Sequence, residues 1–354
     1  MASRRVPGPP VVAVFNHKGG VAKTTSACNL AVCLGAYGLR VLLIDLDAQG
    51  NATGSFGILP LPPAGAYDLI TGRAGLDEVM LPTPFPNLRL LPATVALRTA
   101  DLELAAHERG HAQLRDNLDG RQLAEHADIC IIDCPPALGT ITANALSAAA
   151  AVLIPAKPDP FAHEGLVNTW YEIKRLRERD NADLAVAGIL LTMGGTDPAS
   201  EDVARTIRAE FGDQVYAMEI PHDPKVAEAA QLAVPVAVLD PDGAAGSGYM
   251  TATGEVLRRL TARGISLPAT VGRGEALNTL RDWRAAQPRL RHLGQGGSGW
   301  TAVAKANAPV AQDSAAHDWR PPEPAETEPG HTRLIAAGAF VAGLLVGLAS
   351  RLVF

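Results

Sequence analysis

A glycine-rich loop near the amino terminus restricts the fold of this chain more than any other feature. The loop, residues 16–25, reads Asn-His-Lys-Gly-Gly-Val-Ala-Lys-Thr-Thr and directly follows the apolar run Val11–Phe15. Backbone N–H groups of such a loop, together with the positive end of the next helix, bind phosphate oxygens. That helix is predicted by apolar residues at i, i+3, i+4 and i+7, which are Ala27, Leu30, Ala31 and Leu34. The ligand class that we expect is therefore a nucleotide triphosphate.

The loop departs from the common P-loop pattern G-x-x-x-x-G-K-[ST]. His17 and Ala22 occupy its two glycine positions, and an additional lysine, Lys18, stands near its start. In a P-loop, Lys23 would reach the β- and γ-phosphates and the Thr24 hydroxyl would ligate Mg²⁺. We expect Ala22 to have an ordinary negative φ.

Apolar strands recur along the chain and alternate with helical stretches. The helix after the loop is expected to end near Gly38 in a left-handed conformation. This alternation predicts an α/β fold, a doubly wound and mostly parallel sheet of the P-loop NTPase kind, with nucleotide loops at the carboxyl ends of the strands. The candidate strands are Val11–Phe15, Val41–Asp45, Leu88–Leu91, Ile129–Asp133, Val152–Pro155, Val186–Thr192 and Val215–Glu219.

Three ordered segments resemble the ParA/MinD family of deviant Walker-A ATPases, and most closely the ParA partition ATPases. Residues 18–25 match the pattern K-G-G-x-x-K-T-T, and residues 45–53 match the switch segment D-x-D-P-Q-G-N-A-T except at Ala48. Residues 129–136 match the Walker-B strand with its D-x-P-P end. The resemblance covers residues 8–265, so we expect residues 1–268 to form a ParA-like P-loop ATPase domain.

The resemblance implies roles for single residues. Lys18 would cross to the partner's nucleotide in an ATP-bound homodimer, like an arginine finger supplied in trans. Lys23 would bind phosphate, Asp47 would orient or activate the attacking water, and Asp133 would hold Mg²⁺ together with Thr24. The remaining positions implied to bind nucleotide are Gly19, Gly20, Val21, Ala22, Thr25 and Pro221. The implied activity is hydrolysis of ATP with Mg²⁺, slow until a ParB-like or other activating partner binds.

Charge argues against a general nucleic-acid binder. The net charge is −6, from 31 basic and 37 acidic residues, whereas such proteins usually carry a basic excess or stripe. Lys225 is the only basic residue of a block, Ile220–Ala229, that is often arginine-rich in the family. Non-specific DNA binding therefore stays the less favoured alternative. The basic residues of the helix Thr169–Asp180 are predicted to form a solvated, salt-bridged face, with a DNA or partner surface as the alternative.

The carboxyl-terminal part differs in composition from the rest. Residues 269–332 include Gly294–Gly299 and Pro321–Pro324 and are predicted to be mostly disordered linker, with a short helix around Glu275–Ala286 as an option. Residues 333–354 follow, and Leu334–Ser350 is a run of 17 residues without a charge.

We expect this last segment to be a single transmembrane helix. As a helix, Leu334–Phe354 would be about 32 Å long, against about 30 Å of bilayer hydrocarbon, if Arg351 snorkels to the interface. A buried apolar helix is the disfavoured alternative, because a polar linker separates the segment from any core. The expected location is the cytoplasmic face of the bacterial inner membrane, and the alternative is the cytoplasm or nucleoid.

Two functions remain in view. The first is an ATP-dependent dimerisation switch with partner-stimulated hydrolysis, used in plasmid or chromosome partition or in positioning a cellular complex. The second is a nucleotide-gated membrane scaffold that recruits a partner protein and in which hydrolysis is unimportant.

Overall fold

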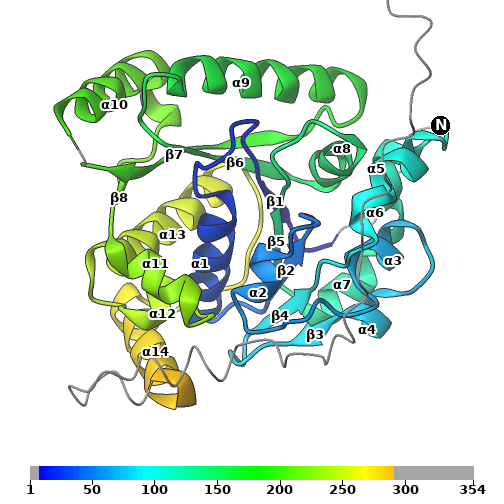
Figure 1. Cartoon of the computed structure of the whole chain (residues 1–354), viewed down its shortest axis with the longest axis horizontal. Coiled ribbons are helices and arrows are strands. Elements are labelled where there is room, and N and C mark those ends of the chain that lie inside the picture. Colours follow the sequence, from blue (N-terminus) through cyan, green and yellow to red (C-terminus); the bar gives the residue numbers. More distant parts are fainter. Residues whose placement is uncertain (1–7, 196, 291–354) are drawn as a thin grey trace, which may run out of the picture. The chain divides into compact units, whose positions relative to one another are not determined.

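The computed structural model describes residues 8–195 and 197–290 of the 354-residue chain. Its centre is an eight-stranded sheet with strand order β3-β4-β2-β5-β1-β6-β7-β8 (Figure 1). Among the described strands, β3 pairs antiparallel with β4 and the other pairs are parallel. The predicted mostly parallel α/β sheet is thus confirmed. The strands are β1 (Val11–Val14), β2 (Val41–Asp45), β3 (Leu81–Pro82), β4 (Leu88–Leu91), β5 (Ile129–Asp133), β6 (Ala151–Ala156), β7 (Ala185–Gly194) and β8 (Ile220–Pro221).

Helices cover both faces of this sheet. Successive strand residues point to opposite faces, so Val12 and Val14 enter one apolar core while Val11 and Ala13 enter the other. Helices α1, α12, α13 and α14 complete the first core, and α3, α5, α8 and α9 complete the second. Figure 1 shows α1 lying beside α13. The α-helices are α1 (Lys23–Ala36), α2 (Asn51–Gly54), α3 (Ala66–Ile70), α4 (Leu76–Val79), α5 (Leu97–Ala105), α6 (Gln113–Asn117), α7 (Gly120–His126), α8 (Thr140–Ala148), α9 (Ala162–Arg179), α10 (Pro198–Phe211), α11 (Pro224–Gln231), α12 (Val236–Leu239), α13 (Ala244–Ala262) and α14 (Arg273–Ala286).

The central strands are apolar on both sides because neither side faces water. All residues of β1, β2, β5 and β6 are buried, as expected for a parallel sheet that is covered by helices on both faces. The first helix is the predicted one, and Gly38 follows it with a φ of +94°, the left-handed conformation that was expected there.

The strand predicted at Val215–Glu219 is wrong. In the described chain, this stretch contributes one isolated parallel bridge, from Val215 to β7, and the strand itself begins later, as β8. The physical reason is competition for the backbone. Arg259 Nη2 donates to the carbonyl oxygen of Val215 at 3.0 Å, and Arg208 Nη1 donates to that of Tyr216 at 2.7 Å. The N–H of Tyr216 already donates to the carbonyl oxygen of Ile189 in β7, so the Tyr216 carbonyl would be the next acceptor of a ladder, and Arg208 occupies it.

The packed part of the chain extends beyond residue 268. Helix α14 lies within the segment predicted to be mostly disordered linker, and it buries Ala276, Leu280 and Trp283 in the first core. The helix expected as an option around residues 275–286 is therefore present, and packing continues to the buried Leu290.

No helix within residues 8–195 and 197–290 has the length and apolarity needed to cross a bilayer. The rest of the predicted linker, residues 291–332, and the predicted transmembrane segment, residues 333–354, lie outside the described residues.

Candidate nucleotide-binding site

Three strands bring the candidate residues to one edge of the sheet. The glycine-rich loop follows β1, Asp45 ends β2, and Asp133 ends β5. These strands are neighbours, and Asp45 and Asp133 are register partners. Carboxyl ends of parallel strands are where ligands bind in such sheets. The loop and the two strand-end carboxylates thus form one site, as the order of motifs indicated.

The loop has an open, left-handed backbone. Gly20 has a φ of +71°, and a Cβ placed on Gly19 or Gly20 would meet no described atom within 4 Å. The negative φ expected for Ala22 is wrong, because the residue has φ 60° and ψ 35°. It precedes the first residue of α1, where the chain must turn sharply to aim helical N–H groups at a phosphate. An L-residue is strained there, by about 1–2 kcal/mol.

Lys23 is buried inside the loop. Its side chain is the first of α1, the residue is 7% exposed, and its Nζ donates to the carbonyl oxygen of Lys18 at 2.8 Å. Burial lowers the pKa of Lys23, and the negative charge of Asp133 opposes that shift. The ammonium is therefore partly desolvated and has an acidic neighbour, which suits a phosphate-binding lysine.

Asp133 is a buried carboxylate in an energetically unfavourable position. It is 0% exposed, and within the described chain neither carboxylate oxygen has a hydrogen bond of normal geometry. Burial, followed by the nearby Asp45 carboxylate, raises the pKa of Asp133 well above its usual range, while the Thr24 hydroxyl and Lys23 act in the opposite direction. A buried carboxylate that lacks well-formed hydrogen bonds is unfavourable by several kcal/mol. A cation would relieve this.

The donor set fits Mg²⁺. This hard cation prefers oxygen ligands and keeps several waters, so one carboxylate and one hydroxyl suffice alongside phosphate. Asp133 and the half-buried Thr24 supply that pair. These two are the predicted metal ligands, and the structure brings them together.

Asp45 is a site residue that we did not single out from the sequence. It is fully buried, its Oδ1 accepts from the backbone N–H of Asp47 at 3.1 Å, and its Oδ2 accepts from Thr53 N at 2.8 Å and Thr53 Oγ1 at 2.7 Å. Burial raises the pKa of Asp45 to about 6, against the effect of the Thr53 hydrogen bonds. Asp45 therefore holds two residues of the switch segment, Asp47 and Thr53, close to the end of β2. The available signal was that it ends a buried strand, as Asp133 does.

Asp47 lies at the exit of β2 and is half-buried. Its Oδ1 accepts from the backbone N–H of Gln49 at 2.9 Å, and its carbonyl oxygen accepts from Gly50 N at 2.8 Å. The carboxylate thus shapes a turn at the rim of the site. Its predicted role toward the attacking water remains a prediction.

Lys18 points to a different place from Lys23. Its Nζ forms an ion pair with Asp159, in the segment that enters α9, and lies 5.8 Å from the ring centre of Phe161. Its backbone N–H donates to Asn16 Oδ1 at 2.9 Å. The Lys18 side chain is 25% exposed, so its ammonium lies at the rim of the loop.

The end of β7 closes the other side of the loop. Val21 is 1% exposed, and its carbonyl oxygen accepts from Thr192 Oγ1 at 3.2 Å. Pro221, in β8, pairs with Gly194 of β7, one strand further away. Thr25 is half-buried in the first turn of α1. The nucleotide contacts expected of Thr25 and Pro221 remain predictions.

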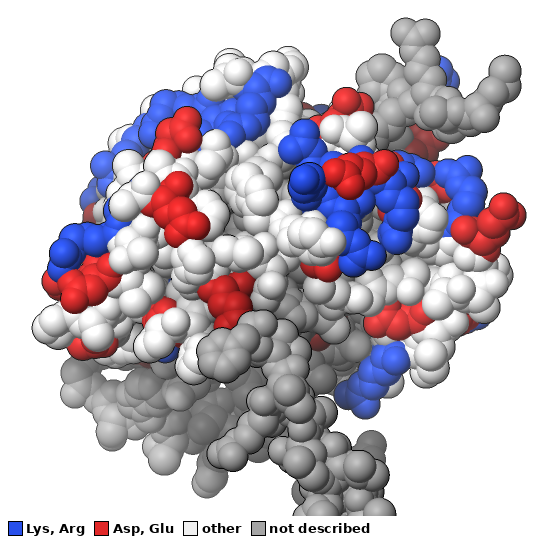
Figure 2. Space-filling view, turned by 90° about the horizontal axis from the view of Figure 1, so that it is seen from above, with Lys and Arg blue, Asp and Glu red and all other residues white. Residues whose placement is uncertain are grey.

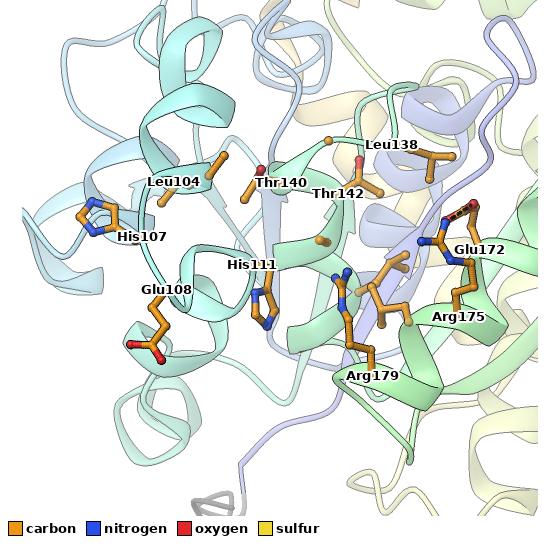
Figure 3. Close-up of a pocket in the computed structure, with 15 residues that line it drawn as sticks. Leu104, His107, Glu108, His111, Leu138, Thr140, Thr142, Glu172, Arg175 and Arg179 are labelled. Carbon is orange, nitrogen blue, oxygen red and sulfur yellow. Dashed lines mark hydrogen bonds and ion pairs between the residues drawn. The ribbon is translucent and has the colours of Figure 1, made fainter.

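A separate cavity of about 550 Å³ lies between α5, α8 and α9 (Figure 3). It contains none of the residues of the loop or the switch. Its two arginines already have acidic neighbours: Arg175 pairs with Glu172, and Arg179 pairs with Asp180. These arginines therefore offer little unopposed positive charge to an anion.

Comparison with known proteins agrees with the site. Residues 10–186 match the AAA domain family. The chain is 39% identical to the chromosome partitioning protein ParA of Caulobacter vibrioides, over 70% of this chain and 94% of that protein. It is 35% identical to the sporulation initiation inhibitor protein Soj of Bacillus subtilis, over 70% of this chain and 97% of that protein.

A solved structure supports the same assignment. Cobyrinic acid a,c-diamide synthase from Mycobacterium smegmatis, with bound ADP and magnesium, superposes with a TM-score of 0.63 at 30% identity. The match covers 75% of this chain and 100% of that one. The chain therefore belongs to the ParA/MinD family of deviant Walker-A P-loop ATPases.

Proposed function

We propose that this chain is an ATP-dependent dimerisation switch that positions a cellular cargo. ATP with Mg²⁺ is bound at the loop, two copies associate, a partner protein stimulates hydrolysis, and the dimer separates. The relatives support the general function, because they are named as chromosome partitioning proteins. The cargo would be a plasmid, a chromosome locus or a membrane-bound complex.

The observation that carries the proposal is the separation of the two loop lysines. Lys23 is buried and directed into its own loop, while the Lys18 ammonium is at the rim and held by Asp159. A lysine needed for the protein's own phosphate would be expected inside, next to Lys23. A lysine at the rim can reach a nucleotide held by a second copy, where it would stabilise charge on the transferred phosphoryl group.

Other residues of the site would bind the phosphates, the cation and the attacking water. Loop N–H groups and Lys23 bind and orient the phosphates, and Asp133 with Thr24 holds the cation, which would neutralise charge on the phosphate oxygens. Asp45 holds the backbone of Asp47 in place, so that the Asp47 carboxylate can orient a water molecule. As is usual for phosphoryl transfer, the protein acts mainly by positioning the reacting groups and not by forming covalent bonds to them.

We also propose attachment to the cytoplasmic face of a bacterial inner membrane through Leu334–Phe354. The support is the uncharged run Leu334–Ser350 and its length relative to a bilayer. Full-length chain and a version ending at Gly330 should be expressed with a fluorescent tag. We expect the full chain at the membrane and resistant to alkaline extraction, and the shorter chain in the soluble fraction. Full-length chain that follows the nucleoid would contradict the anchor.

The surface charges favour a protein partner over DNA. Figure 2 shows the face of α9 and α10, where Lys and Arg gather in groups with Asp and Glu among them. Arg175 and Arg179 are ion-paired, and Lys225 pairs with Glu228 at 2.7 Å. Exposed pairs of this kind add little stability, but they offset part of the positive charge that would bind a phosphate backbone.

Two variants test the switch. Lys18→Ala should bind ATP like wild type but fail to dimerise with ATP, as measured by light scattering after gel filtration. Asp47→Ala should bind ATP and remain dimeric, with phosphate release reduced about 100-fold or more. Lys174→Ala, an exposed lysine on α9, is the matched control and should behave as wild type. Normal ATP-dependent dimerisation of Lys18→Ala would overturn the proposal.

A further inference from the structure

Asn16 and Thr169 form a buried polar pair between the loop and α9. Asn16 is 2% exposed and Thr169 is 0% exposed. The Asn16 side-chain Nδ2 donates to the carbonyl oxygen of Pro155, in β6, at 2.7 Å. Its Oδ1 accepts from the backbone N–H of Lys18 at 2.9 Å and from Thr169 Oγ1 at 3.0 Å. The amide of Asn16 therefore ties the start of the loop to two neighbouring elements.

Thr169 adds a second connection to the same turn. Its Oγ1 accepts from the backbone N–H of His17 at 3.2 Å and lies 2.8 Å from the carbonyl oxygen of Gly165, one turn earlier in α9. Buried polar groups are tolerated when they are hydrogen-bonded, and these are. The backbone of His17 and Lys18 is thus held by two side chains. One is Asn16, just after β1, and the other is Thr169, in the 18-residue helix α9.

The backbone of Lys18 is held from both sides. Its N–H is bound by Asn16, and its carbonyl oxygen accepts from Lys23 Nζ. In the proposed function, the Lys23 ammonium turns to the phosphates of the nucleotide, which are stronger acceptors than a carbonyl. The carbonyl then loses its charged partner. Asn16, supported by Thr169, is the anchor that remains on the Lys18 backbone.

We propose that Asn16 and Thr169 are positioning residues that aim Lys18 at the nucleotide of the second copy, and that they contribute little to ATP binding within their own chain. The inference rests on the proposed function. It separates two roles of one loop: residues 19–25 hold the nucleotide, while this pair sets the direction of the lysine that acts in trans. Misplacing a catalytic group by about 1 Å can reduce a rate by about 100-fold, so an anchor of this kind has a large effect on turnover.

The test removes one hydroxyl group. Thr169→Val keeps the shape of a buried β-branched residue and deletes the bonds to Asn16 and His17, whereas Thr169→Ser keeps the hydroxyl. Thr253→Val is the matched control, because Thr253 is also 0% exposed and helical, and its Oγ1 donates to Tyr249 O at 2.8 Å within α13. Asn16→Ala is the second variant if Thr169→Val does not fold.

We expect Thr169→Val to bind a fluorescent ATP analogue within about threefold of wild type, and to lose about tenfold or more in kcat and in ATP-dependent dimerisation. Thr169→Ser should recover most of both, and Thr253→Val should retain both. A loss of ATP affinity as large as the loss of kcat would make the pair merely structural and overturn the inference. Wild-type turnover in Thr169→Val would also overturn it.

The two proposals can fail separately. A wild-type chain that binds ATP but stays monomeric overturns the proposed function and this inference with it. A wild-type dimer combined with normal dimerisation of Thr169→Val overturns the inference alone.

Discussion

Asp45 and Asp133 are register partners at the ends of two adjacent parallel strands, and both carboxyl groups are completely buried. They differ in their surroundings. Asp45 accepts hydrogen bonds from Asp47 and Thr53, while within the described chain no hydrogen bond of normal geometry reaches Asp133. Burial, followed by the neighbouring Asp45 carboxylate, raises the pKa of Asp133. The nucleotide-free site is therefore unfavourable in its charged form, and this disfavoured charge is what a bound cation would compensate.

Replacing Asp133 with asparagine should stabilise the nucleotide-free protein at pH 8. An acid whose folded-state pKa is raised contributes stability that is fully present below its unfolded pKa, about 3.9, and is lost as the pH rises through the folded value. Asp133→Asn cannot ionise, so it escapes this loss. We expect its free energy of unfolding at pH 8, without Mg²⁺, to exceed that of wild type by about 1–3 kcal/mol. Urea unfolding from pH 5 to 8 measures the difference, which should shrink toward pH 5.

Asp128 provides the matched control for this experiment. Burial alone would raise the pKa of Asp128, but hydrogen bonds from Arg40 lower it overall. The stability that the Asp128 carboxylate contributes is therefore present at neutral pH and is lost on acidification. Asp128→Asn should therefore destabilise the protein at pH 8, opposite in sign to Asp133→Asn. Equal or lower stability of Asp133→Asn at pH 8 would contradict the strain attributed to the buried pair.

Replacing Lys23 with alanine should weaken ATP binding without unfolding the protein. The side chain provides charge-assisted hydrogen bonds to phosphate, and each is worth about 1.5–3 kcal/mol, or a factor of about 10–100 in affinity. Titration with a fluorescent ATP analogue measures the loss, and circular dichroism checks the fold. Lys18→Ala is the matched lysine and should keep its affinity. Wild-type affinity in Lys23→Ala would remove Lys23 from its assigned role.

Replacing Ala22 with glycine should stabilise the protein slightly. The alanine has a φ of 60°, where its Cβ is strained by about 1–2 kcal/mol, and glycine relieves this at the expense of a more flexible unfolded chain. We expect a net gain of roughly 0.5–1 kcal/mol, a rise in Tm of about 1–4 °C. Ala233 has a φ of 53° and lies outside the loop, so Ala233→Gly is the control and should gain a similar amount. A lower Tm for Ala22→Gly alone would show that the alanine methyl group makes a favourable contact in the loop.

The sequence predicted the site better than it predicted the surroundings of the site. Lys23, Thr24 and Asp133 could be placed because loop chemistry and strand ends are local signals. The left-handed Ala22 could not, since loop closure imposes that conformation and no neighbouring residue reveals it. The false strand at Val215–Glu219 has strand-like residues, but arginines from other elements bind its carbonyl oxygens, and one of them, Arg259, lies 44 residues later in the chain. Contacts between distant residues carry no local pattern.

The packing of helix α14 decides whether the folded part extends beyond residue 268. Trp283 is 9% exposed, its ring lies 5.2 Å from that of Phe85, and a Cβ on Gly35 of α1 would be 3.2 Å from its edge. A buried tryptophan replaced by alanine typically loses about 3–5 kcal/mol. We therefore expect Trp283→Ala to lower the free energy of unfolding by that amount in urea titrations.

A chain ending at residue 268 should be less stable than a chain ending at residue 290, by at least as much as Trp283→Ala loses. Trp170→Ala is the control and should lose less, since Trp170 is half-buried and its ring centre lies 6.1 Å from that of Phe211. If the chain ending at residue 268 unfolds at the same urea concentration as the chain ending at 290, α14 adds nothing to the fold. Equal urea midpoints of the two chains would then place the end of the domain at residue 268, as expected from the sequence. We expect the opposite, because the Trp283 ring packs against both α1 and Phe85.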